Sequence, residues 1–136
     1  MINGLSHVSI VVPDLDVAAR KLRETYGLTV SDPRTNAEQG VRLAYVDLGN
    51  AKIELMEPAR ADSPIAKFLE RNPKGGIHHF SLNTADMAAT AAVLSGQGVR
   101  ILGDDRPRYN VAGERIAFIH PADFLGALVE LEEQKT

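Results

Sequence analysis

Residues 75–82 read Gly75-Gly76-Ile77-His78-His79-Phe80-Ser81-Leu82, and the second half of this stretch repeats a segment near the start of the chain. His7-Val8-Ser9-Ile10 matches His79-Phe80-Ser81-Leu82 at a separation of 72 residues (79 − 7 = 72). Both segments are short apolar runs typical of buried strands. Each leads to an aspartate, Asp14 or Asp86, that suits the N-cap of a following helix. The repeat therefore predicts two halves that fold alike.

The repeat continues through the rest of each half. Residues 42–46 (Arg-Leu-Ala-Tyr-Val) match residues 115–119 (Arg-Ile-Ala-Phe-Ile), and residues 53–55 (Ile-Glu-Leu) match residues 129–131 (Val-Glu-Leu). Each half thus reads as βαβββ, which is too small to bury its sheet alone. We therefore expect an α+β fold in one domain. Two tandem modules, about residues 1–74 and 75–136, would lie side by side and form a curved mixed sheet around a cleft.

The segments between these elements carry weaker patterns. Residues 28–30 and 99–102 are predicted as short strands, and residues 31–40 and 103–113, which are polar and contain proline, as loops. Ser63-Pro64 suits the start of a second helix, with Ser63 as its N-cap.

The composition excludes several classes of function. The chain has 136 residues, of which 44% are hydrophobic, and its net charge is −3, so a basic surface for nucleic acid or anionic membrane is not expected. It has no cysteine, which excludes disulfides and thiolate ligands. The N-terminus has no signal-peptide pattern, and no apolar run approaches the roughly 20 residues of a membrane span. We therefore expect a soluble cytoplasmic protein with neither a nucleic-acid nor a membrane partner.

Two polar residues of each half stand inside apolar strands: His7 and Glu54 in the first half, His79 and Glu130 in the second. Successive strand residues point to opposite faces, so each of these side chains opposes its apolar neighbours. A buried carboxylate is costly unless a cation or hydrogen bonds compensate it. Two imidazoles and two carboxylates suit a divalent ion. We expect Co²⁺, and the other candidates are Ni²⁺, Mn²⁺, Zn²⁺ and Fe²⁺. We predict that these residues are the metal ligands; the alternative is that they are solvated side chains on half-exposed strands.

The adjacent histidines cannot both face such an ion. His78 and His79 are neighbours on one strand and therefore point to opposite faces. The repeat aligns His7 with His79, which leaves His78 for a packing or subunit contact.

Several stretches resemble one known family, in order along nearly the whole chain. The most specific are residues 62–69 (DSPIAKFL) and 75–79 (GGIHH); the others include residues 7–10 (HVSI), 26–27 (YG), 40–42 (GVR), 53–58 (IELMEP), 120–121 (HP) and 129–131 (VEL). The βαβββ repeat with His and Glu at matching places is similar to the vicinal oxygen chelate superfamily. Within it, these stretches resemble the methylmalonyl-CoA epimerases.

This resemblance implies a metal-dependent isomerase that interconverts the epimers of an acyl-CoA substrate, methylmalonyl-CoA. The ion would chelate the thioester and carboxylate oxygens and stabilise the enolate left by α-proton removal. Glu54 and Glu130 would be both ligands and acid/base groups, one for each face of the substrate carbon. The resemblance also implies a homodimer. The chain differs from some members in carrying Leu43 where they have a separate glutamate base, and Ala122 where lysine is frequent.

Other functions on the same fold stay open at this point. One alternative is a lactoylglutathione lyase of the glyoxalase I type, and another is a metal-free small-molecule-binding protein. A third is an Fe²⁺ dioxygenase, against which the fourth protein ligand argues, because oxygen and a bidentate substrate need more open positions on the ion.

Overall fold

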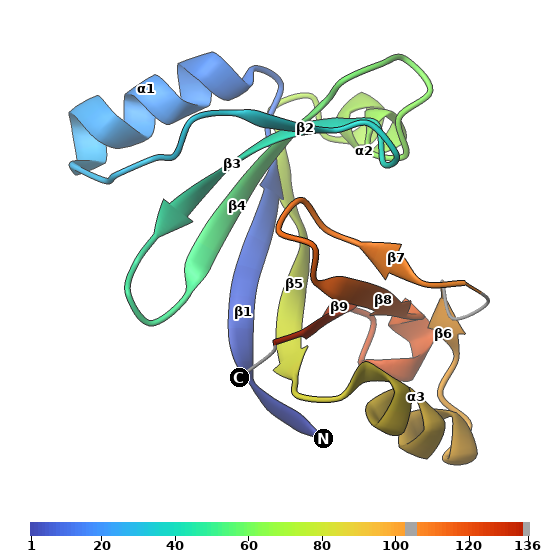
Figure 1. Ribbon diagram of the computed structural model, residues 1–136. Coiled ribbons are helices and arrows are strands. Elements are labelled where there is room, and N and C mark those ends of the chain that lie inside the picture. Colours follow the sequence, from blue (N-terminus) through green and yellow to red (C-terminus); the bar gives the residue numbers. More distant parts are fainter. Residues whose placement is uncertain (103–105, 135–136) are drawn as a thin grey trace. The chain divides into compact units, whose positions relative to one another are not determined.

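The computed structural model describes residues 1–102 and 106–134 (Figure 1). The chain forms two compact units. The N-terminal unit comprises His7–His78, and the C-terminal unit comprises Met1–Ser6 together with His79–Thr136. The first six residues thus belong with the second half of the chain. The tandem-module boundary near residue 74 stays a prediction.

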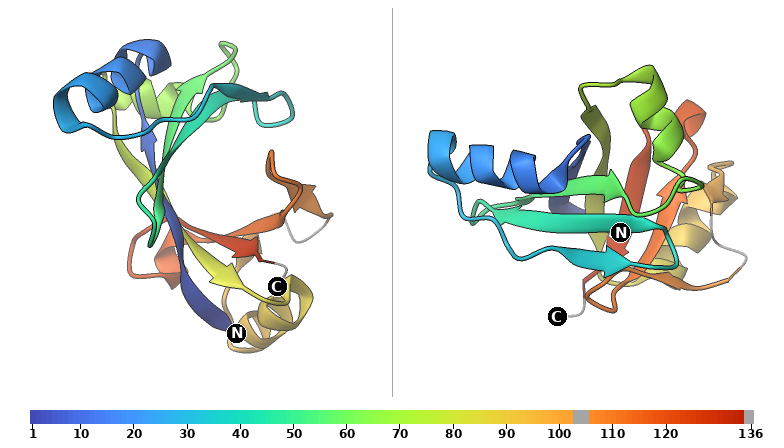
Figure 2. Two further views of the ribbon diagram at one scale, coloured as in Figure 1. Left: turned by 60° about the vertical axis from the view of Figure 1, so that its left-hand side comes forward. Right: turned by 90° about the horizontal axis from the view of Figure 1, so that it is seen from above.

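The N-terminal unit is a four-stranded sheet covered by a helix. Its strands lie in the order β2-β3-β4-β1, with β1 parallel to β4 and the β3–β4 hairpin antiparallel. Helix α1 lies against β3 and β4 (Figures 1 and 2). The elements are β1 (Ile2–Val11, of which the residues from His7 onward belong here), α1 (Leu15–Tyr26), β2 (Arg34–Asn36), β3 (Val41–Asp47), β4 (Lys52–Pro58) and α2 (Ala66–Arg71).

Capping and burial explain the position of α1. The Asp14 carboxylate accepts a hydrogen bond from the Val17 N–H at 3.1 Å, and Gly27 ends the helix in the left-handed conformation at φ 65°. The Asp14 cap was predicted from the sequence. The buried face of the helix packs into an apolar core formed by Leu15, Ala19, Val30, Ala44, Val46 and Leu55.

The C-terminal unit repeats this plan. Its strands lie in the order β5-β9-β8-β6, with β7 also paired to β8; β5 is parallel to β9, and helix α3 packs against β6 and β9. Its core consists of Met87, Ala117, Ile119, Val129 and Leu131. The elements are β5 (Gly76–Thr84, from His79 onward in this unit), α3 (Met87–Gly96), β6 (Ile101–Leu102), β7 (Arg108–Tyr109), β8 (Arg115–Ile119), the 3₁₀ turn η1 (Pro121–Asp123) and β9 (Val129–Glu133).

The predicted βαβββ plan is confirmed in both units, with β7 as an additional strand in the C-terminal unit. The repeat extends to a contact that the sequence alone does not reveal. In each unit a glutamate on the last strand accepts a hydrogen bond from the first backbone N–H of the helix. The Leu15 N–H donates to Glu57 Oε2 at 2.9 Å, and the Met87 N–H donates to Glu133 Oε2 at 2.7 Å. A carboxylate there satisfies an otherwise orphaned donor and complements the positive end of the helix dipole.

Some local predictions were wrong. Residues 31–40 contain the edge strand β2, and residues 103–113 contain β7, although residues 103–105 of this loop lie outside the described part of the chain. Residues 28–30 form only an isolated bridge, between Val30 and Val46. Ser63 is not a side-chain cap: α2 begins at Ala66, its N-cap is Ile65, and the Ser63 backbone oxygen accepts from Ala66 N–H instead.

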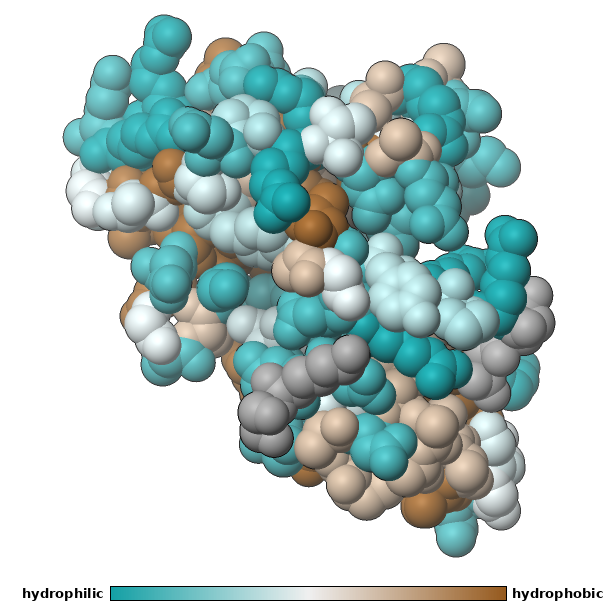
Figure 3. All heavy atoms as spheres, in the orientation of Figure 1, coloured by the Kyte–Doolittle hydropathy of each residue, from teal (hydrophilic) through white to brown (hydrophobic). Residues whose placement is uncertain are grey.

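The two helices differ in their outer surfaces. Figure 3 shows mainly hydrophilic side chains over α1 and less hydrophilic ones over α3. The exposed residues of α1 include Asp16, Arg20, Lys21, Arg23 and Glu24, whereas those of α3 include Ala88, Ala89, Ala92 and Val93. Within residues 1–102 and 106–134, no helix has the length and apolar character that crossing a membrane requires.

Candidate metal-binding and catalytic site

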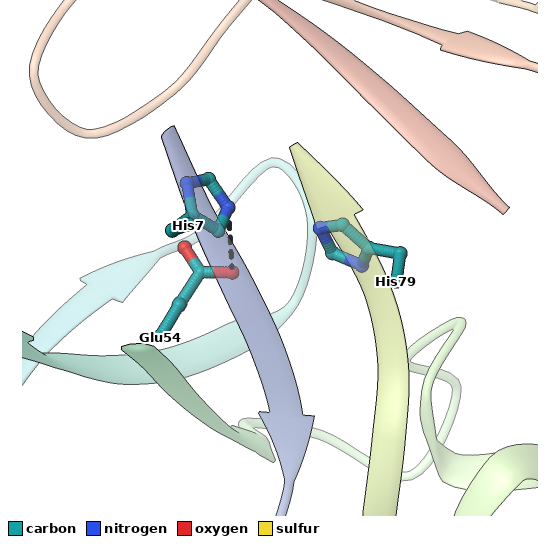
Figure 4. Close-up of side chains that lie close together, drawn as sticks. All are labelled: His7, Glu54 and His79. Atoms are coloured by element: carbon teal, nitrogen blue, oxygen red, sulfur yellow. Dashed lines mark ion pairs between the residues drawn. The ribbon is translucent and has the colours of Figure 1, made fainter. Parts of the chain in front are cut away.

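In the N-terminal unit, parallel pairing of β1 and β4 brings His7 and Glu54 together on one face (Figure 4). The two side chains are buried, with residue exposures of 2% and 7%. His7 Nε2 lies 3.8 Å from Glu54 Oε1. Ser9, which stands opposite Glu54 in the strand register, donates its hydroxyl to the same oxygen at 2.7 Å.

The other oxygen of this carboxylate is held from β3. Tyr45 stands opposite Glu54 in the antiparallel β3–β4 register, and its hydroxyl donates to Oε2 at 3.0 Å. The Tyr45 ring meets the His7 imidazole edge-on, at 6.3 Å between centroids. Burial raises the pKa of Glu54, and the hydrogen bonds from Ser9 and Tyr45 act in the opposite direction.

The C-terminal unit contains an equivalent pair. His79 on β5 (Figure 4) and Glu130 on β9 are 5% and 6% exposed, and His79 Nε2 lies 3.7 Å from Glu130 Oε2. Ser81 donates its hydroxyl to Glu130 Oε1 at 3.1 Å. Phe118 occupies the place of Tyr45: it stands opposite Glu130 in the β8–β9 register, and its ring meets the His79 imidazole edge-on at 5.6 Å.

Each pair suits two ligands of a divalent metal ion. Separations of 3.7 and 3.8 Å are longer than a nitrogen–oxygen hydrogen bond. Two ligand atoms that are each about 2.1 Å from one ion lie at most about 4.2 Å apart, and both pairs meet this limit. Imidazole and carboxylate are also the donor types that such ions bind. All four side chains are buried, so they are not the solvated strand residues of the alternative interpretation.

The residues that orient these carboxylates were not assigned from the sequence. Ser9 and Ser81 follow each histidine by two residues, so the repeat carried a signal for them. Tyr45 gave no such signal, because its contact depends on the register between two strands. A further buried carboxylate was missed: Glu132 is 6% exposed and accepts from the Ser6 hydroxyl at 2.9 Å within the C-terminal unit.

Two other sequence interpretations concern neighbouring positions. Leu43 is buried in β3 and carries no group that could transfer a proton. His78 makes an edge-to-face contact with Phe68 of α2, at 5.2 Å between ring centroids, which confirms the predicted packing role.

Comparison with known proteins places these residues in a family. A family model described as the glyoxalase/bleomycin resistance protein/dioxygenase superfamily matches residues 6–118. An ethylmalonyl-CoA/methylmalonyl-CoA epimerase from Cereibacter sphaeroides is 45% identical over 133 residues, which cover 98% of this chain and 99% of that protein. The chain belongs to the methylmalonyl-CoA epimerase family.

Solved structures of methylmalonyl-CoA epimerases confirm the predicted fold. The Mycobacterium tuberculosis epimerase matches with a TM-score of 0.91 and 37% identity, over 99% of this chain and 90% of that chain. A Streptomyces coelicolor epimerase variant in complex with 2-nitronate-propionyl-CoA matches with a TM-score of 0.89 and 37% identity, over the full length of both chains. The resemblance seen in the sequence, and the vicinal oxygen chelate fold that it implied, are therefore correct.

Proposed function

We propose that this protein is an enzyme that interconverts the epimers of methylmalonyl-CoA. The observation that carries the proposal is the match to named epimerases over nearly the whole chain. The duplicated site also suits the reaction. Epimerisation removes a proton from one face of a carbon and returns one to the other face, and each unit offers a buried glutamate held beside a histidine.

Four residues would hold a divalent metal ion: His7, Glu54, His79 and Glu130. Co²⁺ is placed first, and Ni²⁺, Mn²⁺, Zn²⁺ and Fe²⁺ are the other candidates. The matched burial, donor types and separations of the two pairs support this assignment. A bound ion would supply positive charge to the substrate oxygens on which negative charge develops.

Glu54 and Glu130 would transfer the protons. One carboxylate takes the α-proton, which leaves the electron pair of the broken C–H bond delocalised toward the thioester. The other, as a carboxylic acid, returns a proton to the opposite face of the same carbon. In the metal-free protein, burial raises the pKa of the Glu54 carboxyl. Leu43 stands where some family members have a separate glutamate base and cannot transfer a proton, so proton transfer is assigned to Glu54 and Glu130.

The test is incubation with (S)-methylmalonyl-CoA and Co²⁺ in D₂O, followed by mass spectrometry. We expect deuterium at the α-carbon and the appearance of the second epimer. Glu54→Gln should abolish incorporation, and Glu57→Gln is the matched control, because Glu57 lies on the same strand but holds the α1 N-terminus. Absence of α-deuterium with the wild-type protein would refute the proposal.

The same preparation separates the alternative functions. Turnover of the methylglyoxal–glutathione hemithioacetal would indicate a lyase of the glyoxalase I type. A metal-free binding protein would contain no stoichiometric transition metal by elemental analysis after purification from metal-supplemented medium.

We further propose that the protein is a cytoplasmic homodimer. The support for the dimer is the family resemblance. Light scattering of the purified protein should give twice the mass of the chain, and a mass of 14.7 kDa would contradict this assembly.

A further inference from the structure

Each carboxylate of the duplicated site stands opposite an aromatic residue of the neighbouring strand, and the two units differ in this residue. Tyr45 and Phe118 are equivalent in the repeat and in the strand register, opposite Glu54 and Glu130 respectively. Both rings make the same edge-on contact with the histidine of their unit. Only Tyr45 carries a hydroxyl, and that hydroxyl donates to Glu54 Oε2 at 3.0 Å.

The strand register and two ring contacts fix the position of this hydroxyl. The Tyr45 backbone N–H donates to the Ser31 hydroxyl at 2.9 Å, and the Lys52 ammonium lies 5.8 Å from the centre of the ring, within range of a cation–π interaction. The His7 imidazole meets the ring edge-on. The phenol is thus held in place by groups other than Glu54 itself, which is what an orienting group requires.

The two hydrogen bonds on Glu54 define the rotation of its carboxylate. Ser9 donates to Oε1, the oxygen that lies nearest His7 Nε2, and Tyr45 donates to Oε2. With a donor fixed on each oxygen, rotation about the terminal bond breaks two hydrogen bonds at once. By holding Oε2, the Tyr45 hydroxyl therefore also keeps Oε1 oriented toward His7. Groups that hold a ligand in this way are known to affect metal affinity and activity by about 10- to 100-fold.

We propose that Tyr45 is a positioning residue that orients the Glu54 carboxylate through its hydroxyl. This role rests on the proposed function, in which Glu54 is a metal ligand and a proton-transfer group. Tyr45 acts through Glu54 and has no direct part in the reaction. Phe118, at the equivalent position of the C-terminal unit, has no hydroxyl to donate.

The experiment compares Tyr45→Phe with the wild type in two measurements. Co²⁺ affinity is measured by chelator competition together with the visible absorption spectrum of the bound ion, and kcat and KM are measured for methylmalonyl-CoA. We expect Co²⁺ affinity to fall by about 10-fold, with an altered spectrum, and kcat to fall while KM stays within about twofold. Tyr109→Phe, which removes a hydroxyl from a half-exposed tyrosine of β7, is the control and should change neither quantity.

A double-mutant cycle separates orientation of Glu54 from a general packing effect. If Tyr45 acts through Glu54, Tyr45→Phe should change Co²⁺ affinity by less than twofold in a Glu54→Ala background, which lacks the acceptor of the Tyr45 hydroxyl. An equal loss in both backgrounds would overturn the proposal, and so would a Tyr45→Phe protein with wild-type Co²⁺ affinity and kcat. A wild-type protein that neither binds Co²⁺ nor incorporates deuterium would instead refute the proposed function, and this inference with it.

Discussion

Gly75, the first residue of the Gly-Gly-Ile-His-His stretch, should be among the glycines least tolerant of a side chain. Its φ is +85°, and a Cβ atom built there would lie 2.3 Å from the backbone oxygen of Val11. Gly75→Ala therefore has two costs. The left-handed conformation costs an alanine about 1–2 kcal/mol. The backbone shift that relieves the overlap with Val11 costs about 1–3 kcal/mol more. We expect the free energy of unfolding to fall by roughly 2–5 kcal/mol.

Gly27 provides a matched control in the same unit. Its φ is +65°, but a Cβ there would meet no atom within 4 Å. Gly27→Ala should therefore lose only the conformational part, about 1–2 kcal/mol. The difference between the two variants isolates the cost of the close approach to Val11, which we expect to be about 1–3 kcal/mol.

Urea unfolding followed by far-UV circular dichroism measures both variants. The protein should be treated with a chelator, because a bound metal would add stability by mass action. In thermal unfolding, each kcal/mol should shift the Tm by roughly 3–5 °C for a chain of this length. Equal losses for Gly75→Ala and Gly27→Ala would show that the predicted clash with Val11 does not govern this position.

Three further predictions concern strain and pH. Leu125 is 99% exposed with φ 56°, so Leu125→Gly should raise the free energy of unfolding by about 0.5–1 kcal/mol in urea; a loss would contradict the assigned strain. The Arg100 guanidinium lowers the pKa of Asp123 from 3.8 to about 2. The contribution of this ion pair to stability is therefore complete above pH 3.8 and is lost as pH falls toward about 2. Asp123→Asn should flatten that part of the stability profile, and an unchanged slope would count against the pair. Burial raises the pKa of Glu54 above 4.5, so the folded metal-free protein binds more protons than the unfolded chain and loses stability as pH rises past 4.5. Glu54→Gln should remove this pH-dependent loss of stability. If the free energy of unfolding of the variant falls with pH as in the wild type, Glu54 is not the cause of the loss.

The sequence was sufficient for the elements whose patterns are local. The start of α1 after Asp14 was predicted because a helix cap depends on a few adjacent residues. The His and Glu pairs were found because alternation within one strand assigns each side chain to a face. Strand β2 was missed because three residues at a sheet edge show no usable period. The Tyr45 hydrogen bond was missed because it depends on how β3 and β4 align, which neither strand encodes by itself.

The placement of residues 1–6 has a consequence for folding during synthesis. These residues belong to the C-terminal unit, and Ser6 donates its hydrogen bond to Glu132, 126 residues later in the chain. Synthesis of His7–His78, which form the other unit, is complete before Glu132 is added to the chain. Closure of the C-terminal unit therefore waits until its last strand, β9, has been made.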